Sequence, residues 1–182
     1  MYQGKNPTAL QSREWLINAL LELMKTENFA QITVGQICKK ADLSRQTFYN
    51  LFDSKEDILH NYLKQQYELQ FETLCHKDSL SINDIVEAFS DVITENKEVL
   101  RLIIDNHLEG ILTAELSECI KLFAEHFAVK TDDDVTLPYG IAFLSGALAQ
   151  TLVFWLKQDN PISADEISKL LEAFFSGEYF KI

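Results

Sequence analysis

The side chains with the clearest chemical potential stand together in one short stretch of the chain. Arg45 and Gln46 carry planar groups that form paired hydrogen bonds with guanine and adenine edges, and the methyl group of Thr47 can meet thymine. Tyr49 and Asn50 add further polar groups. This combination of residue types predicts a helix that reads base edges in the major groove of DNA.

Capping signals predict two short helices that would position these side chains. Thr33 and Gln36 have the spacing of a capping box, which starts a helix over about 33–40. Ser44 is a second N-cap, and it starts a helix over about 45–51. A helix, a tight turn and a capped second helix follow one another in the helix-turn-helix motif.

Apolar residues in the same segment predict how the helices pack. Ile37, Ala41 and Leu43 supply small and apolar contacts where the two short helices cross. Phe48 would hold the second of them against a first helix over about 9–25. The polar residues of the second helix then face outward.

The segment from Ile32 to Leu59 resembles the N-terminal signature of the TetR family of transcriptional regulators. The positions that carry the resemblance are Thr33, Ile37, Ala41, Leu43, Ser44, Thr47, Phe48, Tyr49, Phe52, Lys55 and Leu59. The resemblance implies an all-α fold, with a three-helix helix-turn-helix DNA-binding domain over 1–53 and a helical effector-binding and dimerisation domain over 54–182.

The resemblance also implies DNA contacts for individual positions. Bases or adjacent phosphates would be approached by Ser44, Arg45, Gln46 and Thr47, phosphates would be held by Thr33, Tyr49 and Lys55, and Asn50 completes the outward face. Two positions depart from the family pattern, since Gly35 stands where a basic residue is common and Asp42 replaces the usual turn glycine. Asp tolerates the left-handed turn conformation, so we expect the fold to survive and the affinity for DNA to be lower.

The rest of the chain predicts further helices. Glycine and proline are scarce, at 6 and 3 residues, which disfavours a turn-rich β architecture. Apolar periodicity and caps, including a capping box at Ser163, place helices at about 54–75, 81–95, 99–106, 108–129, 137–158 and 163–175, with an acidic loop over 130–136. The predicted fold class is all-α with about nine helices.

Charge is unevenly distributed along the chain. The net charge of −12 disfavours phosphate binding by the molecule as a whole. Through Lys55, however, seven basic residues stand against five acidic ones, so this segment carries +2 and the remainder −14. The split favours a DNA-facing head on an acidic body, although a chance fluctuation could produce so small a positive charge.

Two C-terminal helices are candidates for a homodimer interface. The stretch 138–149 mixes small and bulky residues at helical spacing, which permits close approach of another helix. Together with the last helix it would form a four-helix interface through Gly140, Phe143, Gly146, Ala147, Leu170 and Phe174. Burial in the core of a monomer is the alternative.

An effector pocket would lie among the helices between about 54 and 158. The candidates are polar or aromatic residues on otherwise apolar faces: Tyr67, Phe71, His107, Phe123, His126 and Phe127. Core packing is the alternative for each of them. The four histidines lack the spacing of metal ligands, so neither a metal site nor another cofactor is predicted.

Several other classes of protein are disfavoured. No nucleophile motif, HExxH motif or phosphate-binding glycine loop indicates an enzyme. Cys38, Cys75 and Cys119 are odd in number, widely spaced and not preceded by a signal peptide, which indicates a reducing cytoplasm. The apolar stretch 141–156 is interrupted by polar residues and is expected to be too short for a membrane span.

The predicted function is transcriptional regulation, with repression as the family's common mode. The protein would bind palindromic operator DNA as a homodimer and would be released or modulated by an unknown small-molecule effector. The alternative is a coregulator with the same fold that acts mainly through a protein partner.

Overall fold

The computed structural model describes residues 7–77, 81–126, 135–159 and 161–180, and every regular element in these residues is helical. The α-helices are α1 (Pro7–Met24), α2 (Val34–Ala41), α3 (Arg45–Leu51), α4 (Lys55–Cys75), α5 (Ile82–Glu95), α6 (Lys97–Asp105), α7 (Glu109–His126), α8 (Leu137–Leu156) and α9 (Ala164–Phe175). Two short 3-10 helices are η1 (Phe29–Gln31) and η2 (Glu178–Phe180). The all-α prediction is confirmed, and the predicted loop over 130–136 falls largely outside the described residues.

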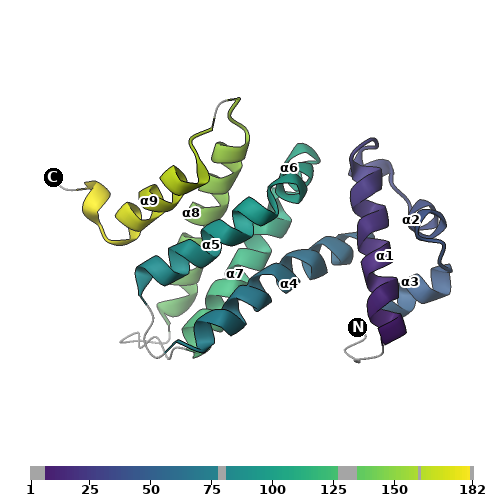
Figure 1. The fold of residues 1–182 in the computed structure, drawn as a ribbon, viewed down its shortest axis with the longest axis horizontal. Coiled ribbons are helices and arrows are strands. Elements are labelled where there is room, and N and C mark those ends of the chain that lie inside the picture. The colour runs from purple at the N-terminus through teal and green to yellow at the C-terminus, as the bar shows by residue number, and fades with distance from the viewer. Residues whose placement is uncertain (1–6, 78–80, 127–134, 160, 181–182) are drawn as a thin grey trace.

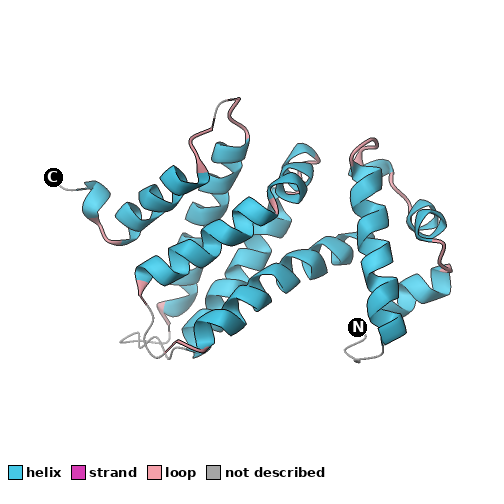
Figure 2. Ribbon diagram, viewed as in Figure 1, coloured by secondary structure: helices cyan, strands magenta, loops and turns pink. Residues whose placement is uncertain are grey.

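The helices form two groups joined by α4. Helices α1 to α3 make a small head at one end, and α4 leads from this head into a body that contains α5 to α9 (Figure 1). Figure 2 shows that short loops join most successive helices. A long α4 therefore connects the predicted DNA-binding segment to the acidic C-terminal body.

Side-chain caps start five of the described α-helices. The capping hydroxyls belong to Thr33, Ser44, Ser54, Ser81 and Ser163. The predicted capping boxes at Thr33 and Ser163 are both present. A further capping box, which was not predicted, pairs Ser81 with Asp84.

The structure differs from the prediction between α1 and α2 and at the start of α6. Asn28 caps the unpredicted turn η1, and the backbone N–H of Phe29 donates to the side-chain oxygen of Asn106 at 2.6 Å. The predicted helix over 99–106 begins two residues earlier, at Lys97, because α5 and α6 meet at the buried Asn96 without an intervening loop.

The head and the body share one hydrophobic cluster. Phe48 of α3 is fully buried in the same cluster as Leu16 and Leu20 of α1, so its predicted packing is confirmed. The cluster continues through Leu59 of α4 to Ile103 of α6. Close-packed interiors transmit displacements, so a movement of α4 would also displace the helices of the head.

Helix α8 is longer than the apolar stretch 141–156 because it begins at Leu137. By length and composition alone it could cross a membrane. Ser145, Ala149 and Leu152 are nevertheless buried against the rest of the fold. A core helix of a globular protein has the same composition, and α8 is packed along α7.

Candidate nucleic-acid interface and effector cavity

The outer face of α3 is polar and accessible. Arg45, Gln46 and Asn50 are exposed, and Tyr49 has 58% of its surface exposed. Phe48 anchors the opposite side of the helix in the core. The structure therefore brings these four predicted DNA-binding side chains together on the surface of the head.

The turn before α3 has the predicted conformation. Asp42 ends α2 with φ 54° and ψ 42°, the left-handed region in which glycine is more common. Ser44 then caps α3 by accepting a hydrogen bond from the backbone N–H of Thr47 at 3.0 Å, and the two hydroxyl oxygens lie 2.8 Å apart. The cap orients both hydroxyls at the start of the predicted recognition helix.

Thr33 is exposed at the start of α2 and belongs to a small polar network. Its backbone N–H and its hydroxyl both donate to the side-chain oxygen of Gln36, each at 2.8 Å. The amide of Gln36 donates to Glu27 at 2.8 Å. This network links Thr33 to the loop that follows α1.

Gly35 provides space for the guanidinium of Arg45. A Cβ atom at Gly35 would lie 2.7 Å from Nη2 of Arg45, closer than real Cβ contacts allow. The sequence shows Gly35 only as the loss of a basic residue. The structure shows that the cation of Arg45 lies against this position instead.

Lys55 holds the segment between α1 and α2. Its Nζ atom donates to the carbonyl oxygens of Phe29 at 2.6 Å and Ile32 at 2.9 Å, and it lies 4.4 Å from the centre of the Phe29 ring. Two of the three ammonium donors are thus used inside the head. The predicted phosphate contact of Lys55 stays a prediction, next to a structural role that sequence reasoning missed.

Two neighbouring residues of α4 link the head to the body. The side-chain oxygen of Asn61 accepts a hydrogen bond from the guanidinium of Arg13 in α1. Nδ1 of His60 lies 2.6 Å from a carboxylate oxygen of Glu115 in α7. The same turn of α4 therefore contacts the N-terminal head on one side and the acidic body on the other.

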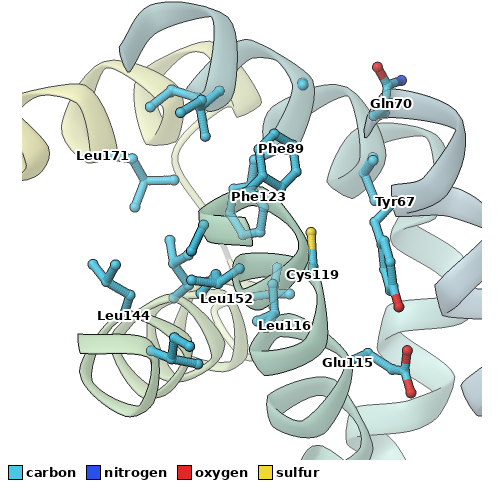
Figure 3. A pocket seen from close by; sticks show the side chains of 18 of the residues that line it. Tyr67, Gln70, Phe89, Glu115, Leu116, Cys119, Phe123, Leu144, Leu152 and Leu171 are labelled. Atoms are coloured by element: carbon cyan, nitrogen blue, oxygen red, sulfur yellow. The ribbon is translucent and has the colours of Figure 1, made fainter. Parts of the chain in front are cut away.

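The body contains a cavity of about 680 Å³ lined almost entirely by apolar side chains from α4 to α9. Figure 3 shows labelled members of its lining: Tyr67, Gln70, Phe89, Glu115, Leu116, Cys119, Phe123, Leu144, Leu152 and Leu171. This volume falls within the usual range of small-molecule pockets.

Only some of the six predicted pocket residues lie in the wall of the cavity. Tyr67 and Phe123 line the cavity. Phe71 stands behind Phe123, with ring centres 4.9 Å apart, and the exposed His126 packs its ring on Phe71 at 5.2 Å. His107 is exposed on the turn between α6 and α7, away from the lining, and Phe127 lies outside the described residues.

Burial and negative charge favour the neutral forms of two groups in the cavity wall. Burial, reinforced by the carboxylate of Glu115, raises the pKa of the Tyr67 hydroxyl above its usual range. The same two causes raise the pKa of the Cys119 thiol to about 12. Within the described part of the chain, no group of three potential metal ligands occurs.

An exposed apolar stripe runs along α8. Tyr139, Phe143 and Phe154 have 76%, 73% and 65% of their surfaces exposed, and their spacing places them on one face of the helix. Ala147, from the predicted interface, is exposed in the same stripe. So large an apolar surface is characteristic of an interaction site.

The other predicted interface residues are less uniformly placed. Gly140 is exposed but also lines the cavity, and Gly146 is half-buried. Leu170 and Phe174 of α9 are half-buried against the core. The structure therefore supports part of both alternatives for this set, exposed interface and monomer core.

Two family models match the chain. "Bacterial regulatory proteins, tetR family" covers residues 16–62, and "Transcriptional regulator C-terminal region" covers residues 80–177. A curated relative, the HTH-type transcriptional regulator AlkX of Mycobacterium tuberculosis, is 25% identical over 77 residues. That match spans 42% of this chain and 36% of the relative.

Solved structures share the fold over almost the whole chain. The crystal structure of Lin0861 from Listeria innocua has a TM-score of 0.76 at 16% identity, covering 100% of this chain and 97% of that one. The dihydroxyacetone kinase operon activator DhaS has a TM-score of 0.60 at 17% identity, covering 92% and 95%. A TetR transcriptional regulator from Streptococcus agalactiae 2603V has a TM-score of 0.60 at 18% identity, covering 92% and 94%.

The two family models together account for both parts of the molecule, the head with its exposed recognition helix and the body with its cavity. This chain belongs to the TetR family of bacterial transcriptional regulators.

Proposed function

We propose that this regulator binds double-stranded operator DNA as a homodimer, with α3 in the major groove. One observation carries the proposal: α3 is fixed by the buried Phe48 and presents Arg45, Gln46 and Asn50 to solvent. Helix-turn-helix proteins insert such a face into the major groove, and the first residues of the helix reach base edges. Arg45 and Gln46 hold those first positions.

The remaining head residues would position the protein on the DNA backbone. Ser44 and Thr47 are assigned to bases or adjacent phosphates, and Thr33 and Tyr49 to phosphates, because all four have accessible or part-exposed hydroxyls. Lys55 would share its third ammonium donor with a phosphate. Such contacts set the register of the protein without carrying sequence information.

A homodimer would cover the apolar stripe of α8. Phe143 and Ala147 lie at its centre, and a second copy of α8 and α9 would remove them from water, as in other four-helix interfaces. A two-fold dimer would then present two α3 helices to successive major grooves, so the operator would be palindromic.

The cavity would bind the small-molecule effector, and the contacts of His60 and Asn61 would carry its effect to the head. Binding of an effector can shift the protein between states only as far as its affinities for the two states differ. We assign repression as the outcome of operator binding and the cytoplasm as the place where it occurs.

A coregulator that acts through a protein partner is the second candidate. The head carries a net charge of only +2, Asp42 adds a negative charge beside α3, and Lys55 is engaged with backbone carbonyls. These features reduce the number of cations available for phosphates. The structural neighbour DhaS is named as an activator, so the sign of regulation needs its own measurement.

Selection from a randomised duplex pool tests the proposal. The purified full chain should enrich a palindromic sequence and retard it as a dimer at low salt. Failure to enrich any sequence, with the protein folded and dimeric, would favour the coregulator. A reporter gene downstream of the enriched site would then distinguish repression from activation.

A further inference from the structure

We propose that the cavity binds an amphiphilic cation, with its apolar body among the leucines and its protonated amine at Glu115. This inference rests on the proposed effector role of the cavity and adds the chemical class of the ligand. It excludes, in particular, fatty acids and other anionic amphiphiles of similar size.

The apolar part of the site would take the body of the ligand. Leu144 and Leu171 stand on the side of the cavity away from α4, with Leu152 and Leu116 between them and the opposite wall (Figure 3). None of these side chains can form a hydrogen bond, so this region favours hydrocarbon and disfavours polar groups.

Hydrogen-bonding groups gather near α4. Tyr67 and Gln70 of α4 and Glu115 of α7 all lie on the right of the view. The Tyr67 hydroxyl points toward the Glu115 carboxylate, whereas the Gln70 amide points away from both (Figure 3). The Glu115 side chain is only 13% exposed, so its charge lies in a largely desolvated place. A ligand with an apolar body would therefore meet its polar partners at one end.

Charge decides which head group this end accepts. None of the described residues that line the cavity is Lys, Arg or His, and Glu115 is the one carboxylate among them. An anionic head would be buried near a negative charge without a cation in the lining, which is unfavourable. Burial is the main cause of the raised pKa values of Tyr67 and Cys119, and the carboxylate of Glu115 raises both further because it disfavours a second negative charge beside it.

Glu115 has the acceptor groups that an ammonium requires. A carboxylate offers about four acceptor positions on its two oxygens. One oxygen lies 2.6 Å from Nδ1 of His60, and the Tyr67 hydroxyl points toward the carboxylate (Figure 3). Acceptor capacity remains for a ligand N–H, and a charged donor would strengthen the bond.

The test compares three ligands of equal length and different charge. Decylamine, decanol and decanoate are titrated below their aggregation limits against the full chain, near neutral pH and at moderate salt. The readout is protection of the Cys119 thiol from N-ethylmaleimide, measured by mass spectrometry. Cys119 lines the cavity and Cys75 does not, so Cys75 serves as the internal reference.

Decylamine should protect Cys119 at about tenfold lower concentration than decanol, and decanoate should be the weakest of the three. Equal or stronger protection by decanoate would overturn the proposal. Protection by none of the three would also overturn it. Both results leave operator binding to be judged separately, because this assay contains no DNA.

Two variants separate the charge of Glu115 from the general acidity of the body. Glu115→Gln keeps the shape of the side chain and should abolish the preference for the amine while decanol still protects Cys119. Glu118→Gln removes an exposed charge from the same helix and should leave the preference intact. If both variants lost the preference for decylamine to the same extent, the preference would come from surface charge, and the proposal would be contradicted.

His60→Gln keeps the test decisive if Glu115→Gln disturbs folding. This change removes the histidine from the carboxylate without altering the cavity lining. Decylamine should then protect Cys119 at least as well as in the parent protein. A loss of the amine preference in folded His60→Gln protein would show that Glu115 is not the partner of the head group.

Discussion

The ammonium of Lys55 lies 2.6 Å from the carbonyl oxygen of Phe29 and 4.4 Å from the centre of the same residue's ring. The first residue of α4 thereby holds the loop between α1 and α2, which precedes the helix-turn-helix. The contact combines a charge-assisted hydrogen bond with a cation–π interaction.

Lys55→Met should lower the stability of the whole protein. The change removes charged hydrogen bonds to two backbone carbonyls, each of which contributes about 1–3 kcal/mol to stability. Because Lys55 is partly exposed, we expect the lower end of this range. The midpoint of thermal unfolding should therefore fall by several degrees. Lys64→Met is the matched control, because Lys64 is exposed further along α4 and makes only a 3.6 Å surface ion pair with Glu68. Equal unfolding midpoints for the two variants would refute the structural role.

Arg45→Ala and Gln46→Ala should each cost about 1–3 kcal/mol on the preferred operator and little on random DNA, if both side chains read bases. Arg101→Ala, an exposed arginine on α6, controls for the loss of a positive charge elsewhere. Binding selection on a randomised pool should show altered preferences at symmetric positions of both half-sites. If folded, dimeric variants kept the base preferences of the parent protein, other residues would have to read the bases.

Gly35→Ala should displace Arg45 without disrupting α2. The new Cβ would meet the far end of a flexible side chain, which can rotate away, and alanine has a higher helix propensity than glycine. We expect an unchanged or slightly raised unfolding midpoint together with a changed base preference at the position read by Arg45. A preference identical to that of the parent would show that the contact with Gly35 does not orient Arg45.

Phe143→Glu should convert a dimer into a monomer of 20.9 kDa, because it places charges at the centre of the apolar stripe. Leu69→Glu is the control, since Leu69 is 62% exposed on α4 and outside the proposed interface. Light scattering after size exclusion measures both masses. A Phe143→Glu protein that stays dimeric would remove this face of α8 from the interface.

The rate at which Cys119 reacts with iodoacetamide should keep rising with pH and should not reach a plateau near pH 9. The thiolate is the nucleophile, and a pKa raised to about 12 keeps its fraction small at neutral pH, so the rate should increase about tenfold per unit throughout the accessible range. In denaturant, the alkylation rate of the same residue should level off once the pH exceeds the ordinary cysteine pKa of about 8.5. A plateau below pH 9 in the folded protein would contradict the raised value.

The sequence by itself determined the local structure of the head. Capping at Thr33 and Ser44 in the head, as at Ser163 in the body, depends on residues three positions apart, and the left-handed turn at Asp42 depends on one residue. The amphipathic pattern of α3 likewise identified Phe48 as its anchor. Short-range hydrogen bonds and helical periodicity are readable along the chain because they do not require knowledge of the packing.

Only the tertiary structure decided which distant groups meet. The sequence offered Tyr67 and His107 as equal candidates for a pocket, but the paths of α4 and α6 place the first in the cavity wall and the second on an exposed turn. Glu115 was not singled out, since an acidic residue on a helix is usually solvated. Its position beside His60, which is 55 residues earlier in the chain, arises from how α4 packs on α7. Long-range packing of this kind depends on the shapes of all the helices together, and no local pattern encodes it.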